Sequence, residues 1–164
     1  LQGPANPATS PVDVAEELNR DFQMNTENAQ YFTMCYGIID VEAREFRYVT
    51  AGSPPLIVAR GDGTTEVLEV KGFPVGIVER PEYGEQVIRL NPGDRVFLHT
   101  DGVVEAQNDE KNAYGIERMA NEVFKSNEQD LDRCALSIME SVRSWTGPTG
   151  LLDDISILAF EFPR

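Results

Sequence analysis

Side chains that bind soft metals are scarce in this sequence, whose 164 residues include one histidine and two cysteines. Cys35 and Cys134 lie far apart and form no Cys-x-x-Cys pair. Structural zinc sites need four ligands of these types, so the composition counts against a zinc protein. Free, buried thiols in a reducing compartment are expected instead, and we predict a cytoplasmic protein.

Positive charge and long apolar runs are also scarce. The sequence has 14 lysines and arginines against 28 aspartates and glutamates, which gives a net charge of −14. Such a surface repels phosphate backbones, so nucleic acid is excluded as the expected partner. The longest apolar run without charge, Tyr31–Ile39, is far shorter than the about 20 residues that span a bilayer. We therefore expect no membrane segment in this chain.

The sequence does contain enough apolar material for a core. Hydrophobic residues make up 41% of the chain, and a length of 164 residues fits a single domain over residues 1–164. Residues 1–9, in which proline, asparagine, glycine and glutamine gather, are expected to form a flexible lead-in.

Three helices are predicted from capping residues and apolar spacing. The first has Ser10 as its N-cap and would bury Val14, Leu18 and Phe22, which recur every four residues. The third would be capped by Asn127 with Asp130 and end at the Gly147–Gly150 turn. The expected bounds of the three helices are Pro11 to about Met24, Ile116–Lys125 and Glu128–Trp145.

Strand patterns alternate with turn residues between the first two helices. The turns at Val41–Ala43 and Gly61–Gly63 predict hairpins, and Asn91–Asp94 predicts a third that pairs the strands on either side of it. Successive hairpins with helices before and after them indicate an α+β fold, with helices on an antiparallel sheet or sandwich. The expected strands are Tyr31–Ile39, Arg44–Val49, Leu56–Ala59, Thr65–Val70, Glu85–Leu90 and Arg95–Thr100.

Two acidic positions stand at the ends of predicted strands. After the strand Arg95–Thr100 comes Asp101, followed by Gly102, and a strand-end carboxylate beside a glycine suits a hard cation bound through oxygen. Asp-Gly is also a common turn, so a hairpin turn without a ligand is the alternative. The pair Asp153-Asp154 leads into the last apolar strand, where side-chain alternation would let only one of the two face a given site.

Six motifs, in this order and spacing, resemble the SpoIIE/RsbU-type bacterial serine phosphatases, a branch of the metal-dependent (type 2C) protein phosphatases. The resemblance extends from about Val12 to Phe160 and implies a β-sandwich flanked by helices. The six motifs are Ala51–Pro55, Gly72–Gly76, Leu90–Asp94, Thr100–Ala106, Tyr114-Gly115 and Asp153–Ser156.

Two acidic motifs of that family have no counterpart here: a Gly-Asp strand and an Asp-x-Ser-Gly-His-Gly turn, both expected before the first helix. Because the chain begins at Leu1 rather than Met, we interpret it as the C-terminal portion of a longer phosphatase domain. The alternative is a natural domain that has lost half of its metal site. In either case we expect an incomplete two-metal centre and weak or no activity from this chain alone.

The resemblance implies which residues carry the chemistry. Hydrolysis of phosphoserine or phosphothreonine would use two Mn²⁺ or Mg²⁺ ions, which prefer oxygen ligands. Asp101, Gly102 and Asp153 match the family's metal site, and Asp154 would point away from it by strand alternation. Asp154, Glu105 and His99 are candidates for neighbouring roles. Asp154 could instead cap or pair locally, Glu105 could complement a helix dipole, and His99 could be an ordinary strand residue.

The resemblance also implies partners. The expected substrate is a phosphorylated anti-sigma-factor antagonist or a similar phosphoprotein, and a sensor or receiver domain upstream is expected in the whole protein. The sequence does not decide between a monomer and a dimer. A degenerate phosphatase fold that serves as a non-catalytic regulatory or binding module remains the alternative function.

Overall fold

The computed structural model describes residues 10–24, 30–69 and 71–163. Its contacts divide the chain into two compact units. Unit 1 comprises residues 1–53 and 70–90, and unit 2 comprises residues 54–69 and 91–164. The predicted lead-in, residues 1–9, lies outside the described residues.

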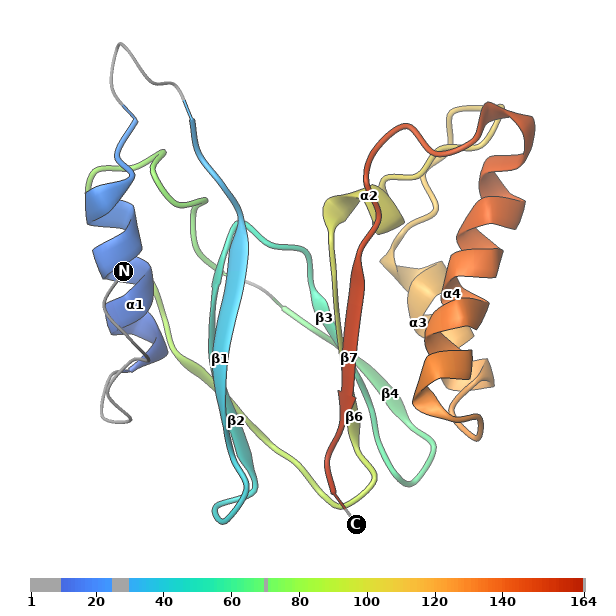
Figure 1. Cartoon of the computed structure of the whole chain (residues 1–164), viewed down its shortest axis with the longest axis horizontal. Coiled ribbons are helices and arrows are strands. Elements are labelled where there is room, and N and C mark those ends of the chain that lie inside the picture. The colour runs from blue at the N-terminus through green and yellow to red at the C-terminus, as the bar shows by residue number, and fades with distance from the viewer. Residues whose placement is uncertain (1–9, 25–29, 70, 164) are drawn as a thin grey trace. The chain divides into compact units, whose positions relative to one another are not determined.

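Unit 1 packs one helix against a three-stranded antiparallel sheet (Figure 1). The strand order is β1-β2-β5, and β1 pairs with β2 along its whole length, from Met34 opposite Ala51 to Asp40 opposite Glu45. The core between the helix and the sheet includes Ala15, Val49 and Tyr83. The elements of unit 1 are α1 (Pro11–Asp21), β1 (Met34–Asp40), β2 (Glu45–Ala51) and β5 (Gln86–Arg89).

The first helix begins as predicted, but its buried face differs from the prediction. The Ser10 hydroxyl accepts hydrogen bonds from the backbone N–H groups of Val12 and Asp13, and α1 ends at Asp21 rather than near Met24. The buried positions are Pro11, Ala15 and Asn19, whereas Phe22 is more than half exposed. Leu18 packs against the core as predicted, but Val14 is only partly buried and Phe22 is exposed, because the buried face contains the polar residue Asn19 instead.

Asn19 is buried because its amide satisfies groups of the Gly72–Gly76 loop and the segment after it. Its Oδ1 accepts a hydrogen bond from the Gly76 N–H at 2.8 Å, and its Nδ2 donates to the Val78 carbonyl oxygen at 3.0 Å. A buried polar side chain costs little when its partners are all present. This residue therefore ties α1 to the predicted loop, which the structure confirms as a loop.

Unit 2 combines a four-stranded antiparallel sheet with helices (Figure 1). The strand order is β4-β3-β6-β7, and the apolar side chains of α3 and α4 pack with Ile57, Ala59 and Phe97 of the sheet. The elements of unit 2 are β3 (Leu56–Ala59), β4 (Thr65–Leu68), β6 (Arg95–His99), α2 (Asp101–Val104), α3 (Ile116–Lys125), α4 (Leu131–Thr146), a 3₁₀ turn (Gly147–Thr149) and β7 (Ile157–Glu161).

One predicted strand pairing is wrong. β5 pairs with β2, and β6 pairs with β3 and β7, so the strands on either side of Asn91–Asp94 lie in different sheets. The buried carboxylate of Asp94 sets the path of this turn, because it accepts hydrogen bonds from the Asn91 N–H, the Gly61 N–H and Arg60 Nη1, each at 2.9 Å. Asp94 is thus a structural turn residue, as the sequence predicted.

The two later helices agree well with the sequence. α3 has the predicted bounds, Ile116–Lys125. α4 begins three residues later than predicted, because its N-cap is Asp130, whose carboxylate accepts from the Arg133 N–H at 2.8 Å. Asn127 does not cap this helix and instead donates to the Arg60 carbonyl oxygen.

The predicted α+β class with antiparallel sheets and helices is confirmed. Both cysteines are free, Cys134 being buried and Cys35 partly buried. Within the described ranges, no helix combines the length and the apolar character that crossing a bilayer requires.

Candidate functional site

Asp101 stands at the junction between a strand and a helix of unit 2. β6 ends at His99, Thr100 is the N-cap residue of the short helix α2, and Asp101 is its first residue. The Asp101 side chain is exposed, and its Oδ1 accepts a hydrogen bond from the Gly102 N–H at 2.9 Å. The Asp-Gly pair is therefore a strand-to-helix junction and not a hairpin turn.

Gly102 is where the second acidic segment comes close. An added Cβ at this buried glycine would lie 2.4 Å from the Asp154 carbonyl oxygen and 3.6 Å from the Asp153 Cβ. Real Cβ atoms do not come this close to another heavy atom, so only glycine allows the two segments to approach this closely. The pairing of His99 with Ile157 places Asp101 and Asp153 at the same end of the sheet, and the lack of a side chain at Gly102 allows the two segments to lie close together.

The Thr100 hydroxyl fastens the two acidic segments together. It donates to the Asp154 carbonyl oxygen at 3.2 Å and accepts from the Ser156 N–H at 3.0 Å. The Thr100 N–H also donates to the Ser156 carbonyl oxygen at 3.0 Å. No local sequence pattern indicates this role, because it consists of two hydrogen bonds between residues more than fifty positions apart.

Asp153 and Asp154 lie before β7 and not within it, since the strand begins at Ile157. The prediction that strand alternation turns Asp154 away therefore rested on a strand that does not extend to these residues. Asp153 is exposed, and its Oδ1 accepts from the Asp154 N–H at 2.8 Å. Asp154 makes its contacts to Thr100 and Asp153 through its backbone oxygen and nitrogen.

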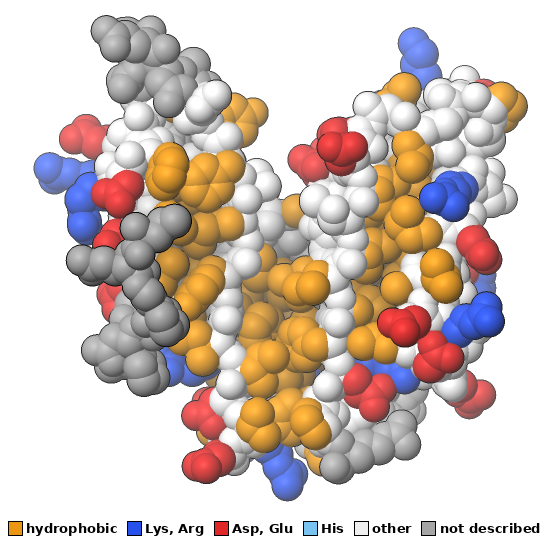
Figure 2. All heavy atoms as spheres, in the orientation of Figure 1, with side chains coloured by type: hydrophobic (Ala, Val, Ile, Leu, Met, Phe, Trp, Pro, Cys, Tyr) orange, Lys and Arg blue, Asp and Glu red, His pale blue; other side chains and the backbone are white. Residues whose placement is uncertain are grey.

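The donor groups at this site are carboxylate oxygens, the chemical type that suits a hard divalent cation. Asp101 and Asp153 each use one carboxylate oxygen on a backbone N–H, and in the described part of the chain neither forms an ion pair with lysine or arginine. Carboxylate oxygens are the ligands that Mg²⁺ and Mn²⁺ prefer. Figure 2 shows acidic side chains gathered where the segment before β7 passes α2. Six ligands make a full shell, so these two carboxylates would supply part of one.

The described ranges contain no group of three or more histidine, cysteine, aspartate or glutamate side chains arranged to hold a metal ion.

Glu105 is exposed and forms the C-cap of α2, with its N–H donating to the Asp101 carbonyl oxygen. Glu105 is therefore at the C-terminal end of α2, where a negative charge does not complement the helix dipole. The alternative in which Glu105 complements a helix dipole is therefore wrong for this helix.

Both ring nitrogens of His99 lie close to backbone carbonyl oxygens. Its Nδ1 lies 3.0 Å from the Thr100 oxygen and its Nε2 lies 3.0 Å from the Pro55 oxygen. Burial lowers the pKa of His99 below its ordinary value, while the two carbonyls and the charge of Asp101 oppose that shift. With both ring nitrogens directed at backbone oxygens, His99 links β6 to the start of β3.

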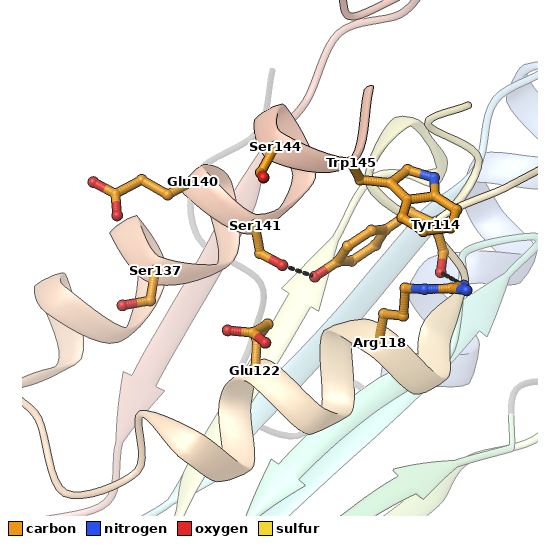
Figure 3. Close-up of a pocket in the computed structure, with 8 residues that line it drawn as sticks. All are labelled: Tyr114, Arg118, Glu122, Ser137, Glu140, Ser141, Ser144 and Trp145. Atoms are coloured by element: carbon orange, nitrogen blue, oxygen red, sulfur yellow. Dashed lines mark hydrogen bonds between the residues drawn. The ribbon is translucent and has the colours of Figure 1, made fainter. Parts of the chain in front are cut away.

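A separate groove of about 530 Å³ lies between α3 and α4, and neither carboxylate is among the residues that line it (Figure 3). At one end the Arg118 guanidinium stacks 3.9 Å above the Trp145 ring, and the Tyr114 hydroxyl donates to Ser141 Oγ at 2.8 Å. Serines of α4 and glutamates of both helices line the rest. We do not assign the reactive site to this groove, because Arg118 stacks on Trp145 and the Tyr114 hydroxyl is hydrogen-bonded to Ser141.

The comparisons with known proteins identify the family. The family model described as Stage II sporulation protein E (SpoIIE) matches residues 1–163. The chain belongs to the SpoIIE family. The resemblance found in the sequence motifs is thereby confirmed.

Individual relatives support the same family. The chain is 34% identical over 100 residues to the phosphoserine phosphatase RsbP of Bacillus subtilis (strain 168), an alignment that covers 58% of this chain and 25% of RsbP. The SiaA-PP2C domain of Pseudomonas aeruginosa superposes with a TM-score of 0.81 at 22% identity, covering 93% of this chain and 61% of that one.

A third relative, the phosphatase domain of the cell fate determinant SpoIIE from Bacillus subtilis, comes from a manganese-presoaked crystal. It has a TM-score of 0.68 at 16% identity and covers 99% of this chain and 77% of that one. At such identities the two structures establish the fold. The match spans only about a quarter of the length of RsbP.

Proposed function

We propose that this chain is part of a metal-dependent phosphatase domain that hydrolyses phosphoserine or phosphothreonine in a regulatory phosphoprotein. The observation that carries the proposal is the close approach at Gly102, which brings Asp101 and Asp153 to one end of the sheet of unit 2. The name of RsbP, a phosphoserine phosphatase, supports the reaction. The manganese-presoaked SpoIIE domain supports Mn²⁺ as the cofactor.

Asp101, Gly102 and Asp153 would form this chain's share of the metal site. Two divalent ions, when bound, would neutralise charge on the phosphoryl group and lower the pKa of a water molecule. The chain's own residues fix the geometry: the Gly102 N–H orients Asp101, the Asp154 N–H orients Asp153, and Thr100 fastens the two segments. No side chain of this site needs to form a covalent intermediate with the phosphoryl group.

The proposed substrate is a phosphorylated anti-sigma-factor antagonist or a similar signalling protein, and the whole protein is proposed to act in the cytoplasm under the control of a sensor or receiver domain. These proposals rest on the family, because the chain spans only part of its relatives.

A second candidate function is a binding module that keeps the phosphatase fold without catalysis. The observation that favours it is that the described ranges hold no group of three ligating side chains. Mn²⁺-dependent hydrolysis of a phosphoserine peptide by the full-length protein distinguishes the two candidates. A phosphatase hydrolyses the peptide, and a binding module does not.

Three substitutions test the site in the full-length protein. Asp101→Asn and Asp153→Asn should each lower kcat/KM for a phosphoserine peptide by about a thousandfold, roughly 4 kcal/mol of lost transition-state stabilisation. Asp154→Asn should cost far less, because Asp154 makes its contacts through backbone atoms that asparagine keeps. The measurement is Mn²⁺-dependent dephosphorylation, with folding checked by circular dichroism. If a folded Asp154→Asn variant loses as much kcat/KM as Asp153→Asn, the choice of Asp153 rather than Asp154 as the metal ligand is wrong.

A further inference from the structure

The stretch that leads from α4 to Asp153 has few contacts of its own. Leu152, directly before Asp153, is 72% exposed, so apolar packing does not hold this stretch. In the part of the chain that the structure describes, residues 148–153 make a single hydrogen bond to another segment, from the Thr149 hydroxyl to Asp109 Oδ1 at 2.5 Å. On the α4 side of Asp153, the path of the chain therefore depends on this bond.

Asp109 lies in a short hairpin that continues from α2. The Gly115 N–H donates to the Val104 carbonyl oxygen at 2.8 Å and closes the base of the hairpin. At its tip, Asn108 Oδ1 accepts a hydrogen bond from the Asn112 N–H at 2.9 Å. Figure 1 shows the chain between α2 and α3 beside the C-terminal end of α4. The hairpin thus holds Asp109 in a fixed position relative to α2.

The bond between Asp109 and Thr149 joins the two acidic segments a second time. Asp101 is the first residue of α2, so the hairpin that carries Asp109 is connected directly to the helix of the first candidate ligand. Thr149 lies four residues before Asp153, the second candidate ligand. The Thr100 hydroxyl holds the same stretch on its β7 side. Asp153 is therefore held on both sides relative to α2.

A carboxylate on a loosely held stretch loses conformational freedom when it binds a metal ion, and a preformed position reduces that cost. We propose that Asp109 is a positioning residue for Asp153 and acts through Thr149. This inference rests on the proposed function, because it takes Asp153 as a metal ligand. It assigns to an exposed acid outside the metal site a share in the affinity of that site.

Two measurements on the full-length protein test the proposal: calorimetric titration with Mn²⁺ alone, and Mn²⁺-dependent dephosphorylation of a phosphoserine peptide. Asp109→Ala removes the acceptor and Thr149→Val removes the donor. Each should raise the Mn²⁺ concentration for half-saturation about fivefold in both measurements, the size expected for one net hydrogen bond. The kcat at saturating Mn²⁺ should stay within about twofold of its original value, because the bound metal then holds Asp153 in place.

Two further variants show whether Asp109 acts through Thr149. Asp109→Asn keeps an acceptor oxygen for the Thr149 hydroxyl and should bind Mn²⁺ like the unchanged protein. The double substitution of Asp109→Ala with Thr149→Val should be no worse than either single substitution, because all three variants lack the same bond.

Asp62→Ala is the matched control. Asp62 Oδ1 accepts a hydrogen bond from the Thr64 hydroxyl at 2.7 Å, an exposed bond of the same kind in the turn between β3 and β4. The pairing of Ala59 with Arg95 places this turn at the end of the sheet where β6 begins, opposite the end that carries the candidate ligands. This variant should leave the dependence on Mn²⁺ unchanged.

The contrary results are distinct from one another. A lower Tm with unchanged Mn²⁺ half-saturation in Asp109→Ala and Thr149→Val would overturn the proposal, because the bond would then be structural only. If Asp109→Asn is as impaired as Asp109→Ala while Thr149→Val is normal, Asp109 acts by its charge and the proposal is also overturned. If the unchanged protein binds Mn²⁺ but does not hydrolyse the peptide, the phosphatase function fails, and the calorimetric titration still decides the role of Asp109.

Discussion

At the scale of single residues, the candidate site depends on the hydroxyl of Thr100 as much as on its carboxylates. This one group satisfies the Ser156 N–H and the Asp154 carbonyl oxygen together. Both bonds join segments that are far apart in the sequence, so they position Asp153 relative to Asp101 without touching either carboxylate.

Replacement of this hydroxyl should loosen the site. Thr100→Val keeps the shape of the side chain but removes both hydrogen bonds, and it should lower the free energy of unfolding by about 1 kcal/mol. In the full-length protein it should also raise the Mn²⁺ concentration needed for half-maximal activity. Thr100→Ser keeps the hydroxyl and is the control. Hydrogen exchange of the Ser156 amide separates the two variants, and equal protection in both would contradict the role given to this hydroxyl.

The thiol of Cys35 gives a pH dependence of stability. Burial raises the pKa of Cys35 from 9.0 to about 11, and burial also raises the pKa of the neighbouring Tyr48 to about 12. Because these folded-state values are raised, the neutral thiol contributes stability that is fully present below pH 9 and is lost as the pH rises towards 11.

We therefore expect the unfolding free energy to fall between pH 9 and pH 11, and this fall to shrink in Cys35→Ala. Thiolate absorbance should place the Cys35 titration near pH 11 in the folded protein carrying Cys134→Ser, and near pH 9 in urea. A folded-state midpoint at or below 9 would contradict the effect of burial.

At the scale of elements, the sequence predicts the later helices and the hairpins β1–β2 and β3–β4, but not the pairing across Asn91–Asp94. α3 was placed correctly and α4 to within three residues, because apolar spacing and caps such as Asp130 act within one turn of a helix. The hairpin across Asn91–Asp94 was wrong, because turn residues fix only the local path. The carboxylate of Asp94 binds Arg60 and Gly61 of another hairpin, and a local pattern does not contain that contact.

The predictions for the candidate site divide in the same way between local patterns and long-range contacts. Asp101, Gly102 and Asp153 were chosen by their match to family motifs, and the contact at Gly102 accounts for why a glycine stands there. The orientation of Asp154 could not be predicted, since it was derived from a strand that begins only at Ile157. Thr100 and Asn19 were missed because their roles are hydrogen bonds over long sequence separations.

At the scale of the whole molecule, the two units are interleaved along the chain. The β3–β4 hairpin of unit 2 is inserted between two parts of unit 1, so no single cut in the chain separates the units. Both candidate carboxylates belong to unit 2, and the described ranges offer no third ligand group with them.

The 164-residue chain by itself should therefore bind Mn²⁺ weakly and hydrolyse p-nitrophenyl phosphate at or near the background rate, because two carboxylates leave most of a six-ligand shell to water. Titration calorimetry measures the binding, and a colorimetric assay with and without chelator measures the turnover. Robust hydrolysis that a chelator abolishes would mean that this chain completes a site on its own.

Trp145 is the sole tryptophan, and it lies in unit 2 beneath Arg118 and beside Tyr114. Intrinsic fluorescence excited at the indole band therefore observes one unit, whereas far-ultraviolet circular dichroism averages over both. If the units melt together, the two signals trace one curve, and if unit 1 melts first, ellipticity is lost while the indole emission is unchanged. The chain thus carries its own optical reporter of whether an interleaved fold unfolds as one body.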